Sequence, residues 1–292
     1  MFAEERFLSK HDPRESSKGF WDTFKPFFSN KVNIAGERVQ LIENGSILSN
    51  NLDIAETFNE HYHTVTDRLN VPRWNSVNGE GSNSVHSAIE HFSNHPSVVK
   101  IAEKWQSDEQ FEFSPVTESQ MLKVIKQLNE SKSVSGGIPT KIIKLAKYVC
   151  APTLTLCFNH SLESNGFPDC LKMADIIHVH KKNSKHDKDN YRPVSLLPCS
   201  SKIFEKVIAN QLNPFLESIF SKSLSSSGKI GAILMDLSKA FDCSPHDLLI
   251  AKFAAYGFGQ RSLKLLHNYL NARKHRVRMG SSFSDFLSSF TR

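Results

Sequence analysis

The residues whose types and spacing bear most directly on chemistry lie in the segment ILMDLSKAFDCSPHDLL. Here the apolar run IGAILMDL has the length and composition of a buried strand, and Asp236 stands near its end. A carboxylate that projects from the end of a rigid strand can hold a hard divalent cation, because Mg²⁺ takes oxygen ligands together with substrate phosphates. The same position also suits an Asp that caps a turn, so the segment alone leaves both roles open.

Basic residues gather in two stretches, although the formal net charge of the whole chain is only +6. The stretch from Arg261 to Arg278 holds six Lys and Arg residues and no acid, and residues 172–188 hold five lysines, three histidines and two aspartates. Clustered positive charge is typical of surfaces that bind nucleic acid, but a basic run is also common on a solvated face. The charge pattern leaves both interpretations open.

Two long segments resemble the reverse transcriptase domain of non-LTR (LINE-type) retrotransposons of the jockey and CR1-like kind. They are HKKNSKHDKDNYRPVSLLPCSSKIFEKVIANQL and KIGAILMDLSKAFDCSPHDLLIAKFAAYGF. Shorter stretches, among them FNEHYHTVTDRL and YLNARKHRVRMGSSFS, extend the similarity over nearly the whole chain. The resemblance implies an RNA-directed DNA polymerase, a nucleotidyltransferase that copies an RNA template by adding dNTPs to a DNA primer, with Mg²⁺ as the cofactor.

The resemblance assigns a catalytic role to the segment that follows the predicted strand. Asp236 matches the family's first catalytic aspartate, which would bind Mg²⁺ with help from the backbone carbonyl of Leu237. Phe241 matches the position of the family's steric gate, where an aromatic ring under the sugar excludes a 2′-hydroxyl.

Two further positions match residues that hold the incoming triphosphate in this family. Arg192 in NYRP is one, and the other is Lys181 or Lys182 in the HKK that precedes it. The residue types agree with that role, because a guanidinium offers forked donors to phosphate, an ammonium offers a point charge, and phosphoryl transfer depends mostly on positioning and charge neutralisation. Without the resemblance, a surface ion pair would be the ordinary role of Arg192.

The chain departs from the family pattern in ways that bear on activity. The family carries roughly thirty more residues between FSKSLSS and SGKIGAI, about the length of one βα unit, and a Gly stands at position 136 where the family has Asp. The chain ends before the family's Gly-Val-Pro-Gln-Gly motif and paired aspartates, and no two adjacent aspartates occur in the 292 residues. We therefore expect an internally deleted, C-terminally truncated and inactive copy, because two-metal catalysis needs several carboxylates. The alternative is a non-catalytic nucleic-acid-binding remnant or a domesticated interaction module.

Apolar periodicity and capping signals predict the helices. An amphipathic helix is expected over 53–69, and Thr117 and Gln120 have the spacing of a capping box before another. Pro152 is expected to begin a helix, and Pro214 to bend or end the helix predicted over 201–215. The stretches ADIIHVHKK and HRVRM are strand-like.

These elements predict an α+β protein. With the resemblance, the expected architecture is a partial right-hand polymerase, fingers and part of the palm, preceded by a mostly helical connector. The expected boundaries are 1–110 for the connector, 111–227 for the fingers-like segment and 228–292 for the partial palm.

Several other classes of protein are disfavoured. The five cysteines are widely spaced without a C-x-x-C pair, which indicates reduced thiols. No stretch approaches the roughly 18 apolar residues of a membrane span and the N-terminus lacks the pattern of a signal peptide, so we expect a cytoplasmic or nuclear protein. The pairs His61/His63 and His178/His180 lack the further ligands of a tetrahedral zinc site. No P-loop or G-x-S-x-G motif is present.

Overall fold

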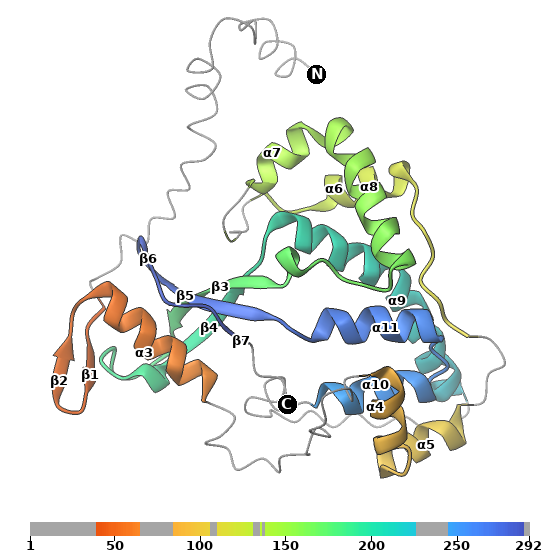
Figure 1. Ribbon diagram of the computed structural model, residues 1–292, viewed down its shortest axis with the longest axis horizontal. Helices are drawn as coiled ribbons and strands as arrows, with labels where there is room; N and C mark the ends of the chain where they lie inside the picture. Colours follow the sequence, from red (N-terminus) through yellow and green to blue (C-terminus); the bar gives the residue numbers. More distant parts are fainter. Residues whose placement is uncertain are drawn as a thin grey trace, which may run out of the picture.

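Helices and strands are mixed along the chain in the computed structural model (Figure 1), which describes residues 39–64, 84–105, 110–130, 135, 138–225 and 245–288. The predicted strand with Asp236 and Leu237, and the position of Phe241, lie outside these residues. The elements are β1 (Leu41–Glu43), β2 (Ser46–Leu48), α3 (Asn51–His63), α4 (Val85–Phe92), α5 (Pro96–Lys104), α6 (Glu118–Gln127), α7 (Thr140–Leu145), α8 (Lys147–Glu163), β3 (Met173–His180), β4 (Tyr191–Leu196), α9 (Cys199–Ser225), α10 (His246–Ala255), α11 (Gln260–Leu270), β5 (Lys274–Met279), β6 (Ser282–Phe283) and β7 (Leu287–Ser288).

A mixed sheet lies at the centre of the molecule (Figure 1), with the strand order β4-β3-β5-β6 and with β7 paired to β5. β3 pairs with β4 in antiparallel register and with β5 in parallel register. Helices and strands together confirm the predicted mixture of α and β structure. Among the described residues, no helix combines the length and apolar character needed to cross a bilayer.

The sheet has two chemically distinct faces because side chains alternate along each strand. The face packed against α3, here called the α3 face, carries Ile176, His178, Tyr191, Val277 and Met279. The opposite face, here called the outer face, carries Asp175, Val179, Arg192, Val194 and Arg276.

Phe58 is the central contact between α3 and the sheet. It is fully buried, its ring stacks on His178 with 4.8 Å between centroids, and it meets Tyr191 edge-on at 5.1 Å. Ile54, one turn earlier in α3, is also fully buried in the same cluster, as the i, i+4 spacing of a helix requires. α3 therefore determines which face of the sheet is covered.

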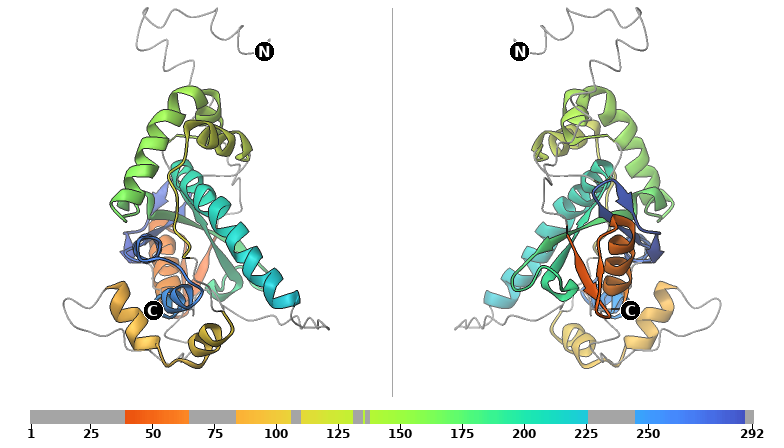
Figure 2. Two further views of the ribbon diagram at one scale, coloured as in Figure 1. Left: turned by 90° about the vertical axis from the view of Figure 1, so that its right-hand side faces the viewer. Right: turned by 90° about the vertical axis from the view of Figure 1, so that its left-hand side faces the viewer.

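A larger core lies among the helices on the other side of the molecule. It joins α6, α8, α9 and α11 through buried side chains such as Met121, Phe158, Phe204 and Leu263. The capping box predicted at Thr117 is confirmed, since both of its reciprocal hydrogen bonds are present at the start of α6. Figure 2 shows α9 as a long helix that runs obliquely along this side of the molecule.

Two prolines lie inside helices. Pro152 lies inside α8 instead of at its start, so that prediction was wrong. α9 continues through Pro214 to Ser225, so of the two outcomes predicted for Pro214, a bend or an end of the helix, the end does not occur. An internal proline costs a helix about 3 kcal/mol, so a favourable term must offset it. After Pro214 this term is apolar packing, because the ring of Phe215 lies 4.7 Å from that of Phe111 and Ile219 is only 2% exposed.

The helix predicted over 53–69 begins earlier, at residue 51, with Asn50 as its N-cap.

His275 makes the stability of this fold dependent on pH. It is a buried residue of β5, and burial lowers its pKa to about 4, with the charge of His63 acting in the same direction. In the unfolded chain a histidine has a pKa of about 6.5. Between pH 6.5 and about 4 the imidazole of residue 275 is therefore protonated in the unfolded chain but neutral in the folded chain. Stability contributed by neutral His275 is complete above pH 6.5 or so and falls as the pH drops toward 4.

We expect the free energy of unfolding to fall between pH 7 and pH 4.5 by about 3 kcal/mol more for the wild type than for His275→Gln, whose side chain does not titrate. Urea unfolding at several pH values measures both profiles. Carboxylates and other histidines contribute equally to the two proteins, so the difference isolates His275. Parallel profiles would contradict the assignment.

Candidate functional site

The antiparallel register of β3 and β4 brings two predicted site residues to the same face of the sheet. Arg192 lies directly opposite Val179. The backbone N–H of Lys181 donates to the carbonyl of Asn190 at 2.8 Å, which extends the ladder by one more pair. Residues 179 and 181 of one strand therefore share a face with residues 190 and 192 of the other. Lys181 and Arg192 are diagonal neighbours on the outer face.

The surface around Arg192 is partly apolar and accessible. Val179 is 45% exposed and Val194 is 40% exposed, and Lys181 and Arg192 are themselves exposed. No ion pair joins the side chain of Lys181, Lys182 or Arg192 to another residue that the structure describes. The positive charges of these residues are thus available to an anion from solvent.

Lys182 differs from Lys181 in its relation to the sheet. It follows the last pair of the ladder, in a bend of the loop. Strand alternation does not extend to this bend. The structure therefore separates two residues that the sequence could not distinguish, because the ladder places Lys181 on the face of Arg192 and does not include Lys182.

The hairpin loop (residues 181–190) is ordered by its own polar side chains. Asp187 accepts from the backbone N–H of Asp189 at 2.9 Å, and the side-chain amide of Asn190 donates to the carbonyl of Ser184 at 3.0 Å. At the base, the Tyr191 hydroxyl donates to the carbonyl of Lys185 at 2.7 Å. These bonds give the loop a defined path between Lys181 and Arg192.

The two histidines of β3 lie on the α3 face, away from Lys181 and Arg192. His178 stacks on Phe58, and burial lowers its pKa. The ring of His180 packs edge-on against Tyr191 with 5.3 Å between centroids, and its Nε2 lies 3.1 Å from the carbonyl oxygen of Asn183. Both rings therefore serve packing and loop order.

The basic stretch 261–278 is divided between structural and exposed positions. Arg276 donates from Nε to the buried carboxylate of Asp175 at 2.8 Å, and its guanidinium lies 4.0 Å from the ring centre of Phe283 and 4.7 Å from that of Phe286. Arg273 lies over the ring of Tyr269 at 4.8 Å. These arginines stabilise the fold, whereas Arg261 and Lys264 are exposed on α11.

Lysines of the stretch 172–188 are divided in the same way. Lys172 is 2% exposed, and its Nζ lies 2.9 Å from Asp169 Oδ1. The hydrogen bond and the charge of Lys172 lower the pKa of Asp169. Lys188 is paired with Glu43 at 2.6 Å. A basic stretch in sequence is thus only partly a basic surface in the fold.

A metal site is not assembled among the residues that the structure describes. No group of three or more His, Cys, Asp or Glu side chains in these residues could hold an ion. Asp236 and Leu237, the ligands implied by the resemblance, lie outside them, as does Phe241. We therefore derive no catalytic step through Mg²⁺.

Comparison with known proteins finds similarity in the C-terminal part of the chain. Residues 179–290 match the reverse transcriptase (RNA-dependent DNA polymerase) family. Relatives in Drosophila melanogaster include the probable RNA-directed DNA polymerase from transposon BS, which is 28% identical over 202 residues, 58% of this chain. The probable RNA-directed DNA polymerase from transposon X-element is 29% identical over 194 residues, 55% of this chain. The RNA-directed DNA polymerase from mobile element jockey is 36% identical over 101 residues, 34% of this chain.

The match supports the non-LTR retrotransposon resemblance seen in the sequence, since these relatives are retrotransposon polymerases. The chain spans 22%, 11% and 21% of the BS, jockey and X-element proteins respectively. The reverse transcriptase match starts at Val179, close to the end of β3. It includes the hairpin loop and Arg192 but not α3.

Sequence reasoning missed the residues that hold this region in place. Asp175 and Arg276 are about a hundred positions apart, and the contact between Glu43 and Lys188 spans still more of the chain. One local signal was present, the Asn44-Gly45 pair, which favours the tight turn between β1 and β2. It predicts a hairpin but not the segment against which that hairpin packs.

We expect Arg276→Met to destabilise the protein by about 2–4 kcal/mol, because it leaves the carboxylate of Asp175 buried without its partner. Urea unfolding at pH 7 measures this loss. The double variant Asp175→Asn/Arg276→Met removes the buried charge and is expected to recover part of it. Arg278→Met is a matched control, since the Nε of Arg278 donates to the carbonyl of Gly280 and to no buried acid. Equal losses for Arg276→Met and Arg278→Met would contradict the structural role of Arg276.

Proposed function

We propose that this chain contributes the fingers and part of the palm of a retrotransposon reverse transcriptase, and that its β3–β4 hairpin binds the triphosphate of an incoming dNTP. The observation that carries the proposal is the placement of Lys181 and Arg192 on one exposed face, where neither side chain forms an ion pair with another residue in the described part of the chain. Two cations on neighbouring strands form a surface that an anion of more than one phosphate can bridge.

The chemistry of the two side chains suits a triphosphate. The planar guanidinium of Arg192 offers forked donors to two phosphate oxygens, whereas the ammonium of Lys181 supplies a compact charge. The exposed apolar side chains of Val179, opposite Arg192, and of Val194, two residues further along β4, flank the guanidinium and offer it no acceptor. Lys182, which lies beyond the β3–β4 ladder, is a weaker candidate for the same contact.

Nucleic acid is the second ligand that we propose. The family's RNA template and DNA primer carry regular negative charge, and exposed cations such as Arg261 and Lys264 on α11 and Lys185 in the hairpin loop can contact it. Such contacts involve phosphate and not base edges, so they would bind without strong sequence preference.

Binding and polymerisation are separable in this chain. Two-metal catalysis places several carboxylates around a pair of cations. The 292 residues contain Asp236 but no two adjacent aspartates, so the paired aspartates of the family's third motif are missing from this polypeptide. This observation favours the alternative function, a nucleic-acid-binding remnant or interaction module, for the chain when it acts by itself.

We expect Lys181→Ala and Arg192→Ala each to weaken binding of dATP by about tenfold, since each removes a charge-assisted hydrogen bond to phosphate. Lys182→Ala should weaken binding less. The measurement is fluorescence anisotropy of a dATP analogue with its fluorophore on the 3′-oxygen, in buffer with Mg²⁺.

Lys206→Ala, a change at an exposed lysine of α9, is the matched control for the loss of one positive charge. It should leave the affinity unchanged. Equal losses for Lys181→Ala, Lys182→Ala and Lys206→Ala would show attraction by net charge alone, and would contradict a site defined by the β3–β4 register.

We expect no primer extension by the 292-residue chain on an RNA template with Mg²⁺, because one catalytic aspartate cannot hold two cations. Binding of a primer–template duplex should nevertheless be measurable at 50 mM salt and fall steeply by about 200 mM, as phosphate contacts require. Asp236→Asn should leave that binding nearly unchanged. If the wild-type chain extends the primer and Asp236→Asn abolishes that extension, the proposed separation of binding from catalysis is overturned.

A further inference from the structure

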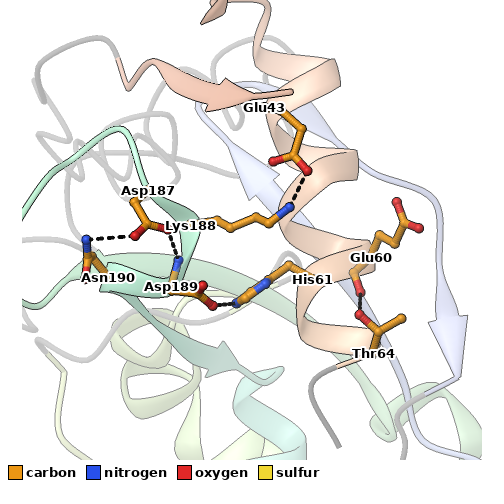
Figure 3. Close-up of polar contacts among 8 residues, drawn as sticks. All are labelled: Glu43, Glu60, His61, Thr64, Asp187, Lys188, Asp189 and Asn190. Atoms are coloured by element: carbon orange, nitrogen blue, oxygen red, sulfur yellow. Dashed lines mark hydrogen bonds and ion pairs between the residues drawn. The ribbon is translucent and has the colours of Figure 1, made fainter. Parts of the chain in front are cut away.

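The hairpin loop is held from outside by the N-terminal unit, residues 39–64, which comprises β1, β2 and α3. Figure 3 shows both side-chain contacts. Lys188 Nζ donates to Glu43 Oε1 at 2.6 Å, and His61 Nε2 lies 3.5 Å from Asp189 Oδ1. Glu43 and Lys188 are 145 positions apart in the chain, so the contact is a feature of the fold and not of the loop.

Backbone contacts attach the loop to β1 as well. The N–H of Ile42 donates to the carbonyl of His186 at 2.9 Å. The ring Nδ1 of His186 lies 3.0 Å from the carbonyl oxygen of Gln40. One backbone bond and one contact of the imidazole ring thus join His186, in the middle of the loop, to β1 and the residue before it. The N-terminal unit thus contacts the loop at residues 186, 188 and 189.

The N-terminal unit is itself anchored to the sheet, which allows it to act as a fixed support. Phe58 is buried against β3 and β4. The side-chain amide of Asn59 donates to the carbonyl of Asp285 at 2.9 Å, and Glu56 Oε1 accepts from the backbone N–H of Asp285 at 2.7 Å. α3 therefore connects the tip of the β3–β4 hairpin to the segment that follows β6.

Electrostatics favours the same arrangement. The loop carries Lys181, Lys182, Lys185 and Lys188, which repel one another. Glu43 neutralises Lys188 in a partly shielded position, since the two side chains are 35% and 20% exposed. Lys181 and Lys182 form no ion pair with another described residue, whereas Lys188 is fixed by Glu43. The loop is therefore ordered by a lysine other than the one that faces the outer side, Lys181.

We propose that the N-terminal unit fixes the hairpin loop in the conformation that binds a nucleotide triphosphate, with Glu43 and His61 as positioning residues. The inference rests on the proposed role of Lys181 and Arg192, the two residues between which the loop runs. A loop that is ordered before binding loses less conformational entropy when the ligand arrives, so its affinity is higher. The family match begins at Val179 and does not include this unit.

The test uses the full chain and two measurements. Amide hydrogen exchange followed by mass spectrometry reports the order of residues 183–190 directly, and anisotropy of the fluorescent dATP analogue reports binding. Glu43→Gln removes the charge that holds Lys188, and Asp189→Asn removes the negative charge that faces His61 at an exposed position. For each variant we expect faster exchange in the loop, unchanged exchange in α6 and α9, and an affinity for the analogue lower by about fivefold.

Glu60→Gln is the matched control, because Glu60 belongs to α3 but its side chain is exposed and points away from the loop in Figure 3. It should leave exchange and affinity unchanged. The charge swap Glu43→Lys/Lys188→Glu should restore both, which a general loss of structure would not allow.

The two measurements separate the failure of this inference from the failure of the proposed function. If the loop exchanges at the same rate in Glu43→Gln, Asp189→Asn and the wild type, the inference is overturned, whatever the affinity for the dATP analogue. Faster loop exchange with unaltered affinity would overturn the link between loop order and binding. A wild-type chain that fails to bind the analogue would overturn the proposed function, while the exchange data would still decide whether the N-terminal unit orders the loop.

Discussion

Side chains alternate along a strand, and the burial of Phe58 against one face of β3 and β4 fixes what the other face presents. His178 and Tyr191 meet α3, so Val179 and Arg192 must point outward. A shift of the β3–β4 register by one residue would move the guanidinium of Arg192 into the apolar α3 face, at a large desolvation cost. The candidate nucleotide site is thus specified largely by packing on the opposite side of the sheet.

Some basic residues form ion pairs that stabilise the fold, whereas others have exposed side chains that an anion from solvent can reach. Lys172 and Arg276 are paired with aspartates, and Lys188 is paired with Glu43. Buried or half-buried cations need such partners, because an unpaired charge away from water is costly. Among the described residues, Lys181 and Arg192 on the outer face form no such ion pair, and they are the positions proposed to hold a triphosphate.

The reverse transcriptase match and the folding unit have different limits. The match begins at Val179, near the end of β3, yet β3 must be complete to pair with β5, and α3 must be present to cover the sheet. The N-terminal unit also contributes contacts to the hairpin loop from outside the matched residues. The part of the chain that resembles a known polymerase is thus supported physically by a part that the match does not include.

Sequence alone indicated the resemblance to reverse transcriptases, the mixed α and β structure, the capping box at Thr117 and the strand character of β3 and β5. These features depend on local interactions or on short motifs, which a sequence displays directly. It could not decide whether the helix predicted to bend or end at Pro214 would continue, because the apolar contacts of Phe215 and Ile219 that offset the proline come from distant segments.

Tertiary structure also decided which lysine accompanies Arg192 and which segment holds the loop between them. The first depends on the β3–β4 register, and the second on a contact across 145 positions of the chain. Pairings of this kind leave no periodic signal in a single sequence, since the entropy of closing so long a loop is repaid only when all of the surrounding packing forms together.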